Sequence, residues 1–237
     1  MDFGKAFTYM IEDPDWTMKM VIGALIVLIT PFLLGIPFLL LLGYQVAITR
    51  QVMEDEVNPL PSWDDIGRLF IDGLNMVIAL LVYSLPAWVL LCVGFAAIFL
   101  PALSGGDEEM AGALAGIGIG IYAIMFCLFI LVALVLAFIT PALNIQYART
   151  GQLGSLFRFA EIVEMTRENL AEVLLSVVAL IGANLVLQLI VFISFITICG
   201  PFILGLVGPV WILAATGHLY GQIGAKEGYT PAPKPAL

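Results

Sequence analysis

Four long stretches without a charged residue constrain the fold of this chain more than any other feature. A helix needs about 20 apolar residues to cross the hydrocarbon of a bilayer, and every stretch exceeds that length. The last of them has 53 residues and must hold two helices, which we expect to separate near Cys199–Pro209. The stretches are Met20–Thr49, Gly73–Gly106, Met110–Ala148 and Val173–Ala225.

The composition supports a membrane location. The chain is 62% hydrophobic and 11% charged, whereas soluble domains carry about 25% charged residues. We therefore predict an all-α membrane protein, a polytopic bundle of five to six hydrophobic helices in one domain over residues 1–225. Residues 226–237 are rich in Pro and Ala and are expected to be a disordered cytoplasmic tail. The hydrophobic helices are expected at about 20–49, 74–100, 111–147, 173–197 and 203–224.

The positions of the basic residues predict the orientation in the membrane. Cytoplasmic loops carry an excess of Lys and Arg. The loop Ser104–Met110 has three acids and no base, and the break near Gly200 is uncharged, so we expect both to face outward. The segments 50–72, 149–172 and 226–237 are then cytoplasmic, in a multi-pass protein of the inner or plasma membrane with a cytoplasmic C-terminus. The nine basic residues are Lys5, Lys19, Arg50, Arg68, Arg149, Arg158, Arg167, Lys226 and Lys234.

The first apolar stretch is compatible with two structures. A single helix over residues 20–49 would be about 45 Å long and would need a strong tilt. Alternatively, Thr30–Pro37 supplies two prolines and a glycine at its midpoint and forms a turn. The two short arms would then make a re-entrant hairpin, the first of three hairpins. The hairpin is favoured because it places all nine basic residues on one side, and Asp2–Asp15 is the surface segment that precedes it.

Two amphipathic segments are expected to lie at the membrane surface, at 62–72 and 155–172. In the first, Ser62 and Asp65 resemble a capping box, and the helix is expected to bend at Gly73 into the following span. Its carboxylates could form a metal or acid/base site, but the absence of a nearby His or Cys favours a solvated helix face. That face carries Asp64, Arg68 and Asp72, and the opposite face, a predicted docking surface, carries Trp63, Ile66 and Phe70.

Few polar side chains occur within the predicted spans. Four of them are candidates for helix–helix hydrogen bonds or for contacts with a solute: Asn144, Asn184, Gln188 and His218. Three glycines at four-residue intervals form a face that permits close helix packing, within the chain or against another copy: Gly112, Gly116 and Gly120. Gly217 and Gly221 repeat this spacing in the last span.

The sequence gives no positive indication of an enzyme. It contains no paired nucleophile and base, and its three cysteines are isolated within apolar stretches. The single histidine cannot form a metal site by itself, and we expect neither a metal nor another cofactor. The net charge of −9 argues against nucleic acid as a partner, because binding to phosphates requires basic patches.

Three motifs resemble an uncharacterised family of bacterial and archaeal polytopic membrane proteins that is catalogued as a domain of unknown function. They are Asp13–Gly23 (DPDWTMKMVIG), Gly43–Val52 (GYQVAITRQV) and Leu60–Leu74 (LPSWDDIGRLFIDGL). The last is similar to that family's signature, which has Leu-Pro, Trp and Asp-Gly-Leu in this order. The resemblance implies a prokaryotic inner-membrane protein and supplies no activity, ligand or catalytic residue.

Two functions remain open from the sequence. The first is a non-enzymatic membrane scaffold or interaction protein, whose partners are the lipid bilayer, other membrane proteins or further copies of itself. The alternative is a carrier or channel for a small or apolar solute, with the amides of Asn144, Asn184 and Gln188 along its path.

Overall fold

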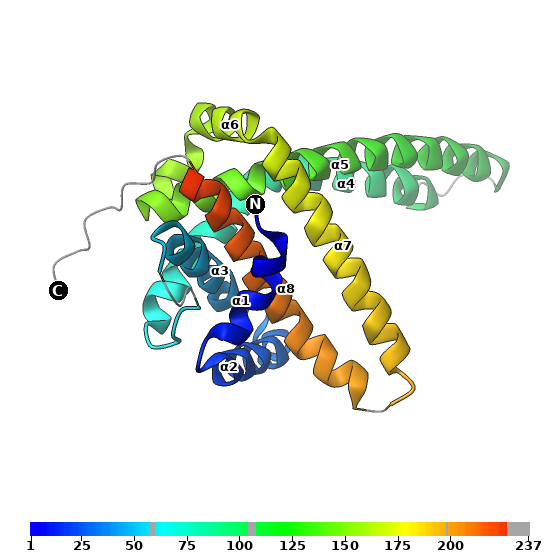
Figure 1. The fold of residues 1–237 in the computed structure, drawn as a ribbon. Helices are drawn as coiled ribbons and strands as arrows, with labels where there is room; N and C mark the ends of the chain where they lie inside the picture. Colours follow the sequence, from blue (N-terminus) through cyan, green and yellow to red (C-terminus); the bar gives the residue numbers. More distant parts are fainter. Residues whose placement is uncertain (57–59, 104–107, 198, 227–237) are drawn as a thin grey trace. The chain divides into compact units, whose positions relative to one another are not determined.

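The fold consists of α-helices joined by short connections, in agreement with the predicted all-α polytopic class (Figure 1). A computed structural model describes residues 1–56, 60–103, 108–197 and 199–226, and the predicted disordered tail therefore lies almost wholly outside the described residues. The described part contains no strand. Its helices are α1 (Phe3–Glu12), α2 (Trp16–Ile29), α3 (Phe38–Met53), α4 (Ile66–Leu103), α5 (Glu108–Thr150), α6 (Phe159–Glu168), α7 (Leu170–Ser194) and α8 (Gly200–Lys226), with 3-10 turns at Thr30–Leu33 and Leu153–Phe157.

Five helical segments are long and apolar enough to cross a membrane. Each has a mean hydropathy of 1.7 or more over at least 18 residues, and each carries large apolar side chains that are exposed. Exposed apolar side chains on this scale are expected where lipid is the solvent. The protein is therefore a multi-pass membrane protein. The segments are Trp16–Leu33, Ile66–Phe99, Gly116–Thr150, Leu170–Ser194 and Gly200–Lys226.

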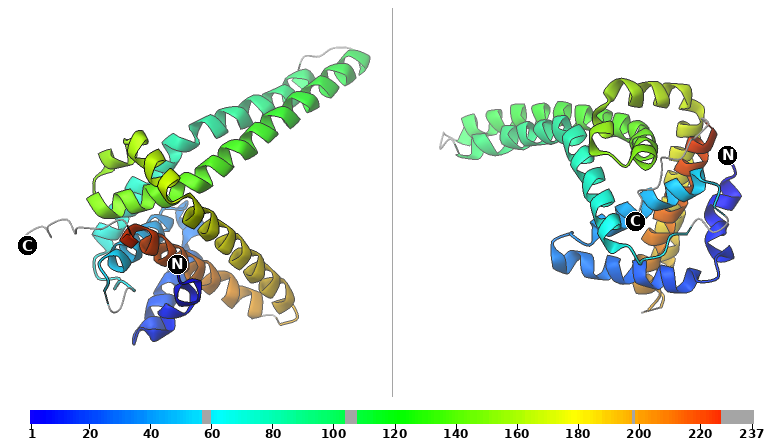
Figure 2. Two further views of the ribbon diagram at one scale, coloured as in Figure 1. Left: turned by 45° about the horizontal axis from the view of Figure 1, so that its top comes forward. Right: turned by 90° about the vertical axis from the view of Figure 1, so that its left-hand side faces the viewer.

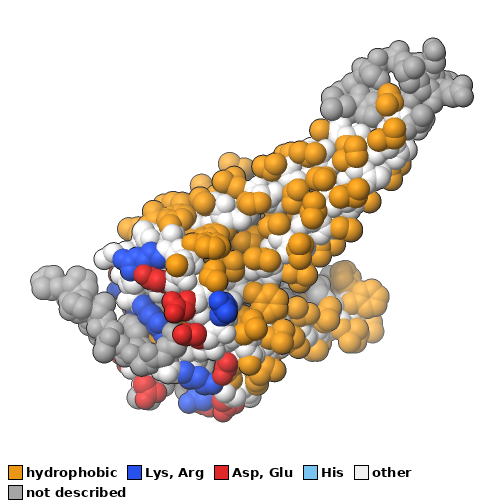
Figure 3. All heavy atoms as spheres, turned by 90° about the horizontal axis from the view of Figure 1, so that it is seen from above, with side chains coloured by type: hydrophobic (Ala, Val, Ile, Leu, Met, Phe, Trp, Pro, Cys, Tyr) orange, Lys and Arg blue, Asp and Glu red, His pale blue; other side chains and the backbone are white. Residues whose placement is uncertain are grey.

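The chain divides into two compact units. Unit 1 comprises Met1–Ala79 and Ile139–Leu237, and unit 2 comprises Leu80–Phe138. On the face drawn in Figure 3, charged side chains gather at one end of unit 1, and hydrophobic side chains cover its helices. This separation of charge from apolar surface is the pattern that a bilayer requires.

The second half of α8 lies at the centre of unit 1. Helix α3 packs along it, with Gly217 and Gly221 facing the α3 backbone at Gln45 and Thr49, as the small-residue spacing predicts. Helices α1 and α2 cover further sides of α8, so that Ala214, Ala215 and Leu219 are fully buried. Figure 1 and Figure 2 show α1 alongside α8.

Tyr9 fixes α1 against α8. Its hydroxyl donates to the carbonyl oxygen of Ala214 at 3.2 Å, and its ring is only 2% exposed. Burial raises the pKa of Tyr9 well above its usual value, and Tyr44 and Asp13 raise it further. The hydroxyl therefore remains a neutral hydrogen-bond donor at every physiological pH.

The first apolar stretch forms two helices and not one. Helix α2 ends at Ile29, a 3-10 turn follows at Thr30–Leu33, and α3 begins at Phe38. Leu34 and Gly35 adopt positive φ angles of 52° and 83°, which reverse the chain between the two prolines. Helices α2 and α3 are about 21 Å and 24 Å long, and α2 with the 3-10 turn forms Trp16–Leu33, the shortest of the five candidate spans. The tip is strongly apolar and exposed, with Leu34 at 94%. The stretch therefore turns at its midpoint, as the hairpin alternative requires.

The two amphipathic segments differ from their predicted boundaries. The first helix begins at Ile66 and not at Ser62, because the Asp65 carboxylate caps it by accepting the Arg68 backbone N–H at 3.0 Å. It continues without interruption past Gly73 as α4. The second segment is divided into the 3-10 turn Leu153–Phe157, helix α6 and the first residues of α7.

Unit 2 is an antiparallel pair formed by the second part of α4 and the first part of α5. Gly118 packs directly on the carbonyl group of Ala97, and Gly94 faces the ring of Tyr122. The predicted packing face of Gly112, Gly116 and Gly120 instead borders open space within the described chain. Gly118 lies on the side of α5 that faces α4, whereas the other three glycines do not.

Helices α3 and α4 cross in unit 1 at two glycines. A Cβ atom on Gly43 would overlap the carbonyl oxygen of Leu69, and one on Gly73 would overlap the carbonyl oxygen of Leu39. The two backbones can approach this closely only because both positions lack a side chain.

We expect Gly43→Ala or Gly73→Ala to lower the stability of the protein by roughly 3 kcal/mol, because the two helices must separate to admit the methyl group. Gly67→Ala, which is in α4 with Gly73, is the control. The nearest atom to a Cβ there is 3.8 Å away, so the melting temperature should be unchanged or higher. Thermal unfolding of the purified protein in detergent measures the difference, and equal melting temperatures for all three variants would contradict the close crossing.

Candidate functional site: a buried polar junction in unit 1

The segment Leu60–Trp63 is held by both arms of the first hairpin. Lys19 of α2 donates from its ammonium group to the Leu60 carbonyl oxygen at 2.7 Å. Tyr44 of α3 donates from its hydroxyl to the Pro61 carbonyl oxygen at 3.1 Å. In return, the Trp63 indole N–H donates to the Lys19 carbonyl oxygen at 3.0 Å. A connection that lacks regular structure therefore has its polar groups satisfied by side chains and backbone of the hairpin.

Two further contacts strengthen this arrangement. The rings of Tyr44 and Trp63 stack with centroids 4.2 Å apart and an interplanar angle of 2°. Lys19 also forms an ion pair with Asp13 at 2.7 Å, and the Asp13 side chain is only 3% exposed. The carboxylate thus neutralises a lysine that would otherwise be buried without a counter-charge.

A second cluster joins α3, α4 and α5, and we name it the Arg50–Asp72 junction. It consists of Arg50, Asp72, Asn75 and Tyr147. The guanidinium nitrogens of Arg50 donate to one Asp72 oxygen at 3.3 and 3.4 Å, and the Tyr147 hydroxyl donates to the other at 2.8 Å. The Asn75 amide donates to that hydroxyl at 2.8 Å. Arg50 also donates to the carbonyl oxygen of Ala148 at 3.1 Å.

The position of Asp72 corrects the sequence prediction. We expected it on a solvated face with Asp64 and Arg68, but Asp72 is 5% exposed. The close crossing at Gly73 turns the preceding residue toward α3, where Arg50 lies. Arg68 still approaches the same carboxylate at 4.0 Å from the exposed side. In the sequence, this pairing was indicated only by the positions of Arg50, which directly follows the first apolar stretch, and Asp72, which directly precedes the second.

The predicted docking face also differs from expectation. Trp63 precedes α4 and stacks on Tyr44, whereas Ile66 is 57% exposed on the first turn of the helix and Phe70 is half-buried. The three side chains therefore do not form one face of a surface helix. The reason is the helix start at Ile66, which leaves Trp63 outside the helical repeat.

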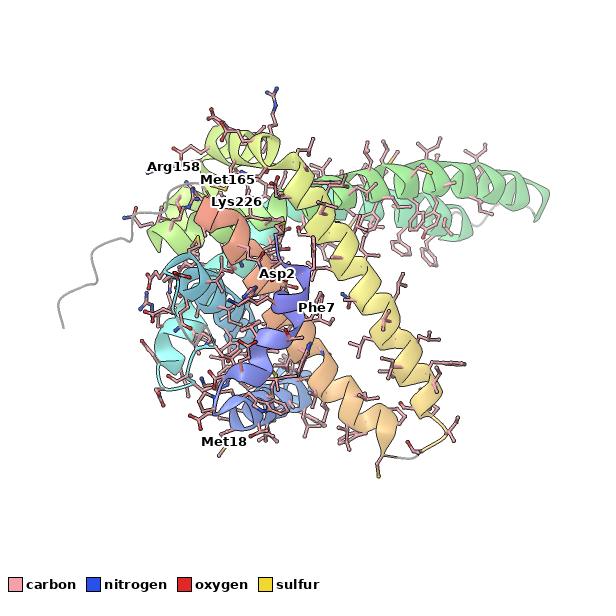
Figure 4. All side chains as sticks on the ribbon, in the orientation of Figure 1. Asp2, Phe7, Met18, Arg158, Met165 and Lys226 are labelled. Atoms are coloured by element: carbon pink, nitrogen blue, oxygen red, sulfur yellow. The ribbon has the colours of Figure 1, made fainter. Side chains whose placement is uncertain are left out.

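His218 lies in the interior of unit 1, where it is 4% exposed. Its ring stacks on Tyr9 with centroids 4.3 Å apart, and its Nδ1 atom is 3.0 Å from the Gln222 amide nitrogen. Gln222 also exchanges two hydrogen bonds with the backbone of Asp2, at 2.7 and 2.9 Å. The histidine thus belongs to a link between the chain's N-terminus and the end of α8, and Figure 4 labels Asp2 and Lys226 at these two ends.

A cavity of about 390 Å³ lies beside this link. Acidic and basic side chains line it, with acids in the majority. The hydrogen-bonded Asp2 backbone and Gln222 side chain form part of its wall. Among the charged lining residues are Asp2, Lys5, Glu12, Asp13, Glu56 and Lys226.

The three predicted amides lie in different surroundings. Asn144 on α5 is 1% exposed, and its side-chain oxygen has no hydrogen-bond partner among the described residues. Asn184 and Gln188 on α7 are exposed, and the Asn184 amide donates only to the Leu180 carbonyl of its own helix at 2.9 Å. The structure therefore does not bring Asn144 together with the other two amides in one site.

The described part of the chain contains no preformed set of metal ligands. No three of its His, Cys, Asp and Glu side chains are grouped for a metal ion. The free cysteines Cys92, Cys127 and Cys199 are each exposed. In the Arg50–Asp72 junction, both carboxylate oxygens and the guanidinium group have hydrogen-bond partners.

The three motifs found in the sequence meet within unit 1. Asp13 and Lys19 come from the first motif, Tyr44 and Arg50 from the second, and Trp63 and Asp72 from the third. A family of proteins described as "Protein of unknown function (DUF4013)" matches residues 22–198. The chain belongs to the DUF4013 family. Comparison with the curated proteins and with the solved structures gives no match.

The DUF4013 match includes the second and third motifs in full and only the last two residues of the first. The structure gives these motifs a physical meaning. Their glycines allow α3 and α4 to cross, and their charged and aromatic side chains fix the hairpin to the start of α4. The signature of DUF4013 in this chain therefore describes how unit 1 is assembled.

Removing one partner of the Arg50–Asp72 junction should destabilise the protein. We expect Asp72→Ala to cost roughly 3 kcal/mol, because it leaves the guanidinium buried without a counter-charge. Arg158→Ala is the control. Arg158 pairs with Glu161 at 3.3 Å, both side chains are at least half exposed, and the loss should be about 0.5 kcal/mol or less. Unfolding in detergent measures both variants, and similar losses would contradict a structural role for Asp72.

Proposed function

We propose that the protein is a non-enzymatic membrane scaffold, which binds another transmembrane helix through the outward face of α7. The observation that carries this proposal is the exposure of Asn184 and Gln188 within an apolar helix. Gln188 has no hydrogen-bond partner among the described residues, and Asn184 donates only to the Leu180 carbonyl of its own helix. A polar group that faces hydrocarbon without a partner costs several kcal/mol. A second helix that supplies such partners would remove this cost.

The remaining surface of α7 fits the same role. Helix α7 has 25 residues, of which only Val173 and Ser176 are buried in the described chain. Its contact with α8 includes Leu187, which packs against Gly208, and Lys226 at the end of α8 pairs with Glu172 at 3.0 Å. Helix α7 is thus held along one side, and the rest of its surface is free to meet lipid or another helix.

The polar groups of unit 1 support a scaffold better than a carrier. In a carrier, Asn184 and Gln188 would line an enclosed path near the middle of the membrane. They are instead exposed on α7, whereas the charged groups of the junction bind one another. A unit 1 that presents two exposed amides on an apolar helix is suited to assembly.

The size of the protein in its native membrane tests this proposal. Extraction with a polymer that retains the surrounding lipid preserves lateral contacts, and mass photometry then gives the mass of each particle. We expect particles heavier than one chain, and we expect the double variant Asn184→Leu/Gln188→Leu to shift them toward single chains.

Val186→Leu is the matched control, because Val186 is 56% exposed on the opposite side of α7 and the change leaves the amides intact. It should retain the wild-type particle mass. Single-chain particles for the wild type, or solute flux into proteoliposomes that the double variant abolishes, would contradict the scaffold and favour the carrier.

A further inference from the structure

Asn184 and Gln188 belong to a continuous stripe on one flank of α7. The stripe follows the helical spacing of three or four residues, and the two amides lie at its centre. Three of its apolar members are large and exposed, with Ile181 at 55%, Phe192 at 74% and Phe195 at 71%. We call this surface the α7 stripe, and it consists of Val177, Ile181, Asn184, Gln188, Phe192 and Phe195.

The α7 stripe lies beside the contact with α8 and not within it. Leu187, the residue that packs on Gly208, lies next to Gln188 in sequence, about 100° around the helix. A helix that docked on the stripe would therefore contact α7 without displacing α8. Both amides lie within the apolar segment Leu170–Ser194, with Asn184 near its middle and Gln188 about one turn further along, where water is absent.

A side-chain amide is self-complementary. It carries a carbonyl acceptor and an amino group with two donors, so that two amides facing each other exchange two hydrogen bonds. Two copies of a membrane protein enter the bilayer in the same orientation, and a two-fold axis along the membrane normal brings each residue of a parallel helix pair opposite itself. Gln188 at such an axis meets the Gln188 amide of the second copy.

We propose that the α7 stripe binds the α7 stripe of a second copy of this chain, with the two Gln188 amides hydrogen-bonded across a two-fold axis. Gln188 forms no hydrogen bond within the described chain, and the amide of a second copy would satisfy its acceptor and one of its two donors. The apolar side chains of the α7 stripe on either side of the amides exclude lipid from the helix pair and fix its register. This inference rests on the proposed function and names the partner that the scaffold binds.

Disulfide formation between copies tests the proposal. Cys92, Cys127 and Cys199 are first replaced by Ala, and a single cysteine is then placed at Ile181 in the stripe or at Val186 on the opposite side. Copies with two different affinity tags are expressed together, and native membranes are oxidised with copper phenanthroline. We expect Ile181→Cys to link two differently tagged copies at least about tenfold faster than Val186→Cys, because a disulfide requires Cβ atoms about 4 Å apart.

The amide is tested in the same background. Gln188→Leu should slow the Ile181→Cys disulfide by about tenfold, whereas Gln188→Asn, which keeps an amide at the same position, should retain most of the rate. Equal rates for Ile181→Cys and Val186→Cys would indicate random collision and overturn the proposal, and so would an unchanged rate for Gln188→Leu.

Mass spectrometry of the linked product distinguishes a failure of the proposed partner, a second copy of this chain, from a failure of the proposed scaffold function. A link from Ile181→Cys to a different membrane protein would overturn the second copy as partner and leave the scaffold function standing. The absence of any link, together with single-chain particles for the wild type, would overturn both.

Discussion

The close crossing of α3 and α4 is the constraint on which the rest of unit 1 depends. Two glycines let the backbones meet, and this contact brings Asp72 against Arg50 at the base of the first hairpin. Tyr147 then ties α5 to the same carboxylate, and Arg50 reaches the backbone at Ala148. A charge pair that would be costly in isolation becomes the point at which three helices meet, because every remaining polar atom of the carboxylate has a donor.

This junction also explains how a short hairpin is held in a membrane protein. Its two helices are short, with 14 and 16 residues, and its turn exposes apolar side chains. The base is fixed by Lys19 and Tyr44, which donate to backbone carbonyls of the irregular segment that follows, and by Trp63 of that segment, which donates to the Lys19 carbonyl. Irregular backbone in a membrane protein is tolerated where protein groups satisfy it. Residues of all three motifs thus hold an irregular connection beside membrane helices.

The sequence predicted an all-α bundle of five to six apolar helices because apolar length indicates which segments can cross a bilayer. Of the two structures that it left open for residues 20–49, the one with a turn at Thr30–Pro37 agrees with the structure. It did not predict which sides of the helices meet. A helix that is apolar all round, such as α5, carries no pattern that distinguishes Gly118 from Gly116, and Arg50 and Asp72 are separated by 22 residues. These contacts depend on the rotation of whole helices, which local periodicity does not encode.

A double-mutant cycle on Arg50 and Asp72 tests the central role of the junction most directly. The free energy of unfolding is measured for the wild type, Arg50→Met, Asp72→Leu and the double variant in the same detergent. Our account predicts a coupling energy of about 2 kcal/mol, with the double variant more stable than the sum of the single losses implies. A coupling energy near zero would show that the two side chains stabilise unit 1 independently and would contradict the account.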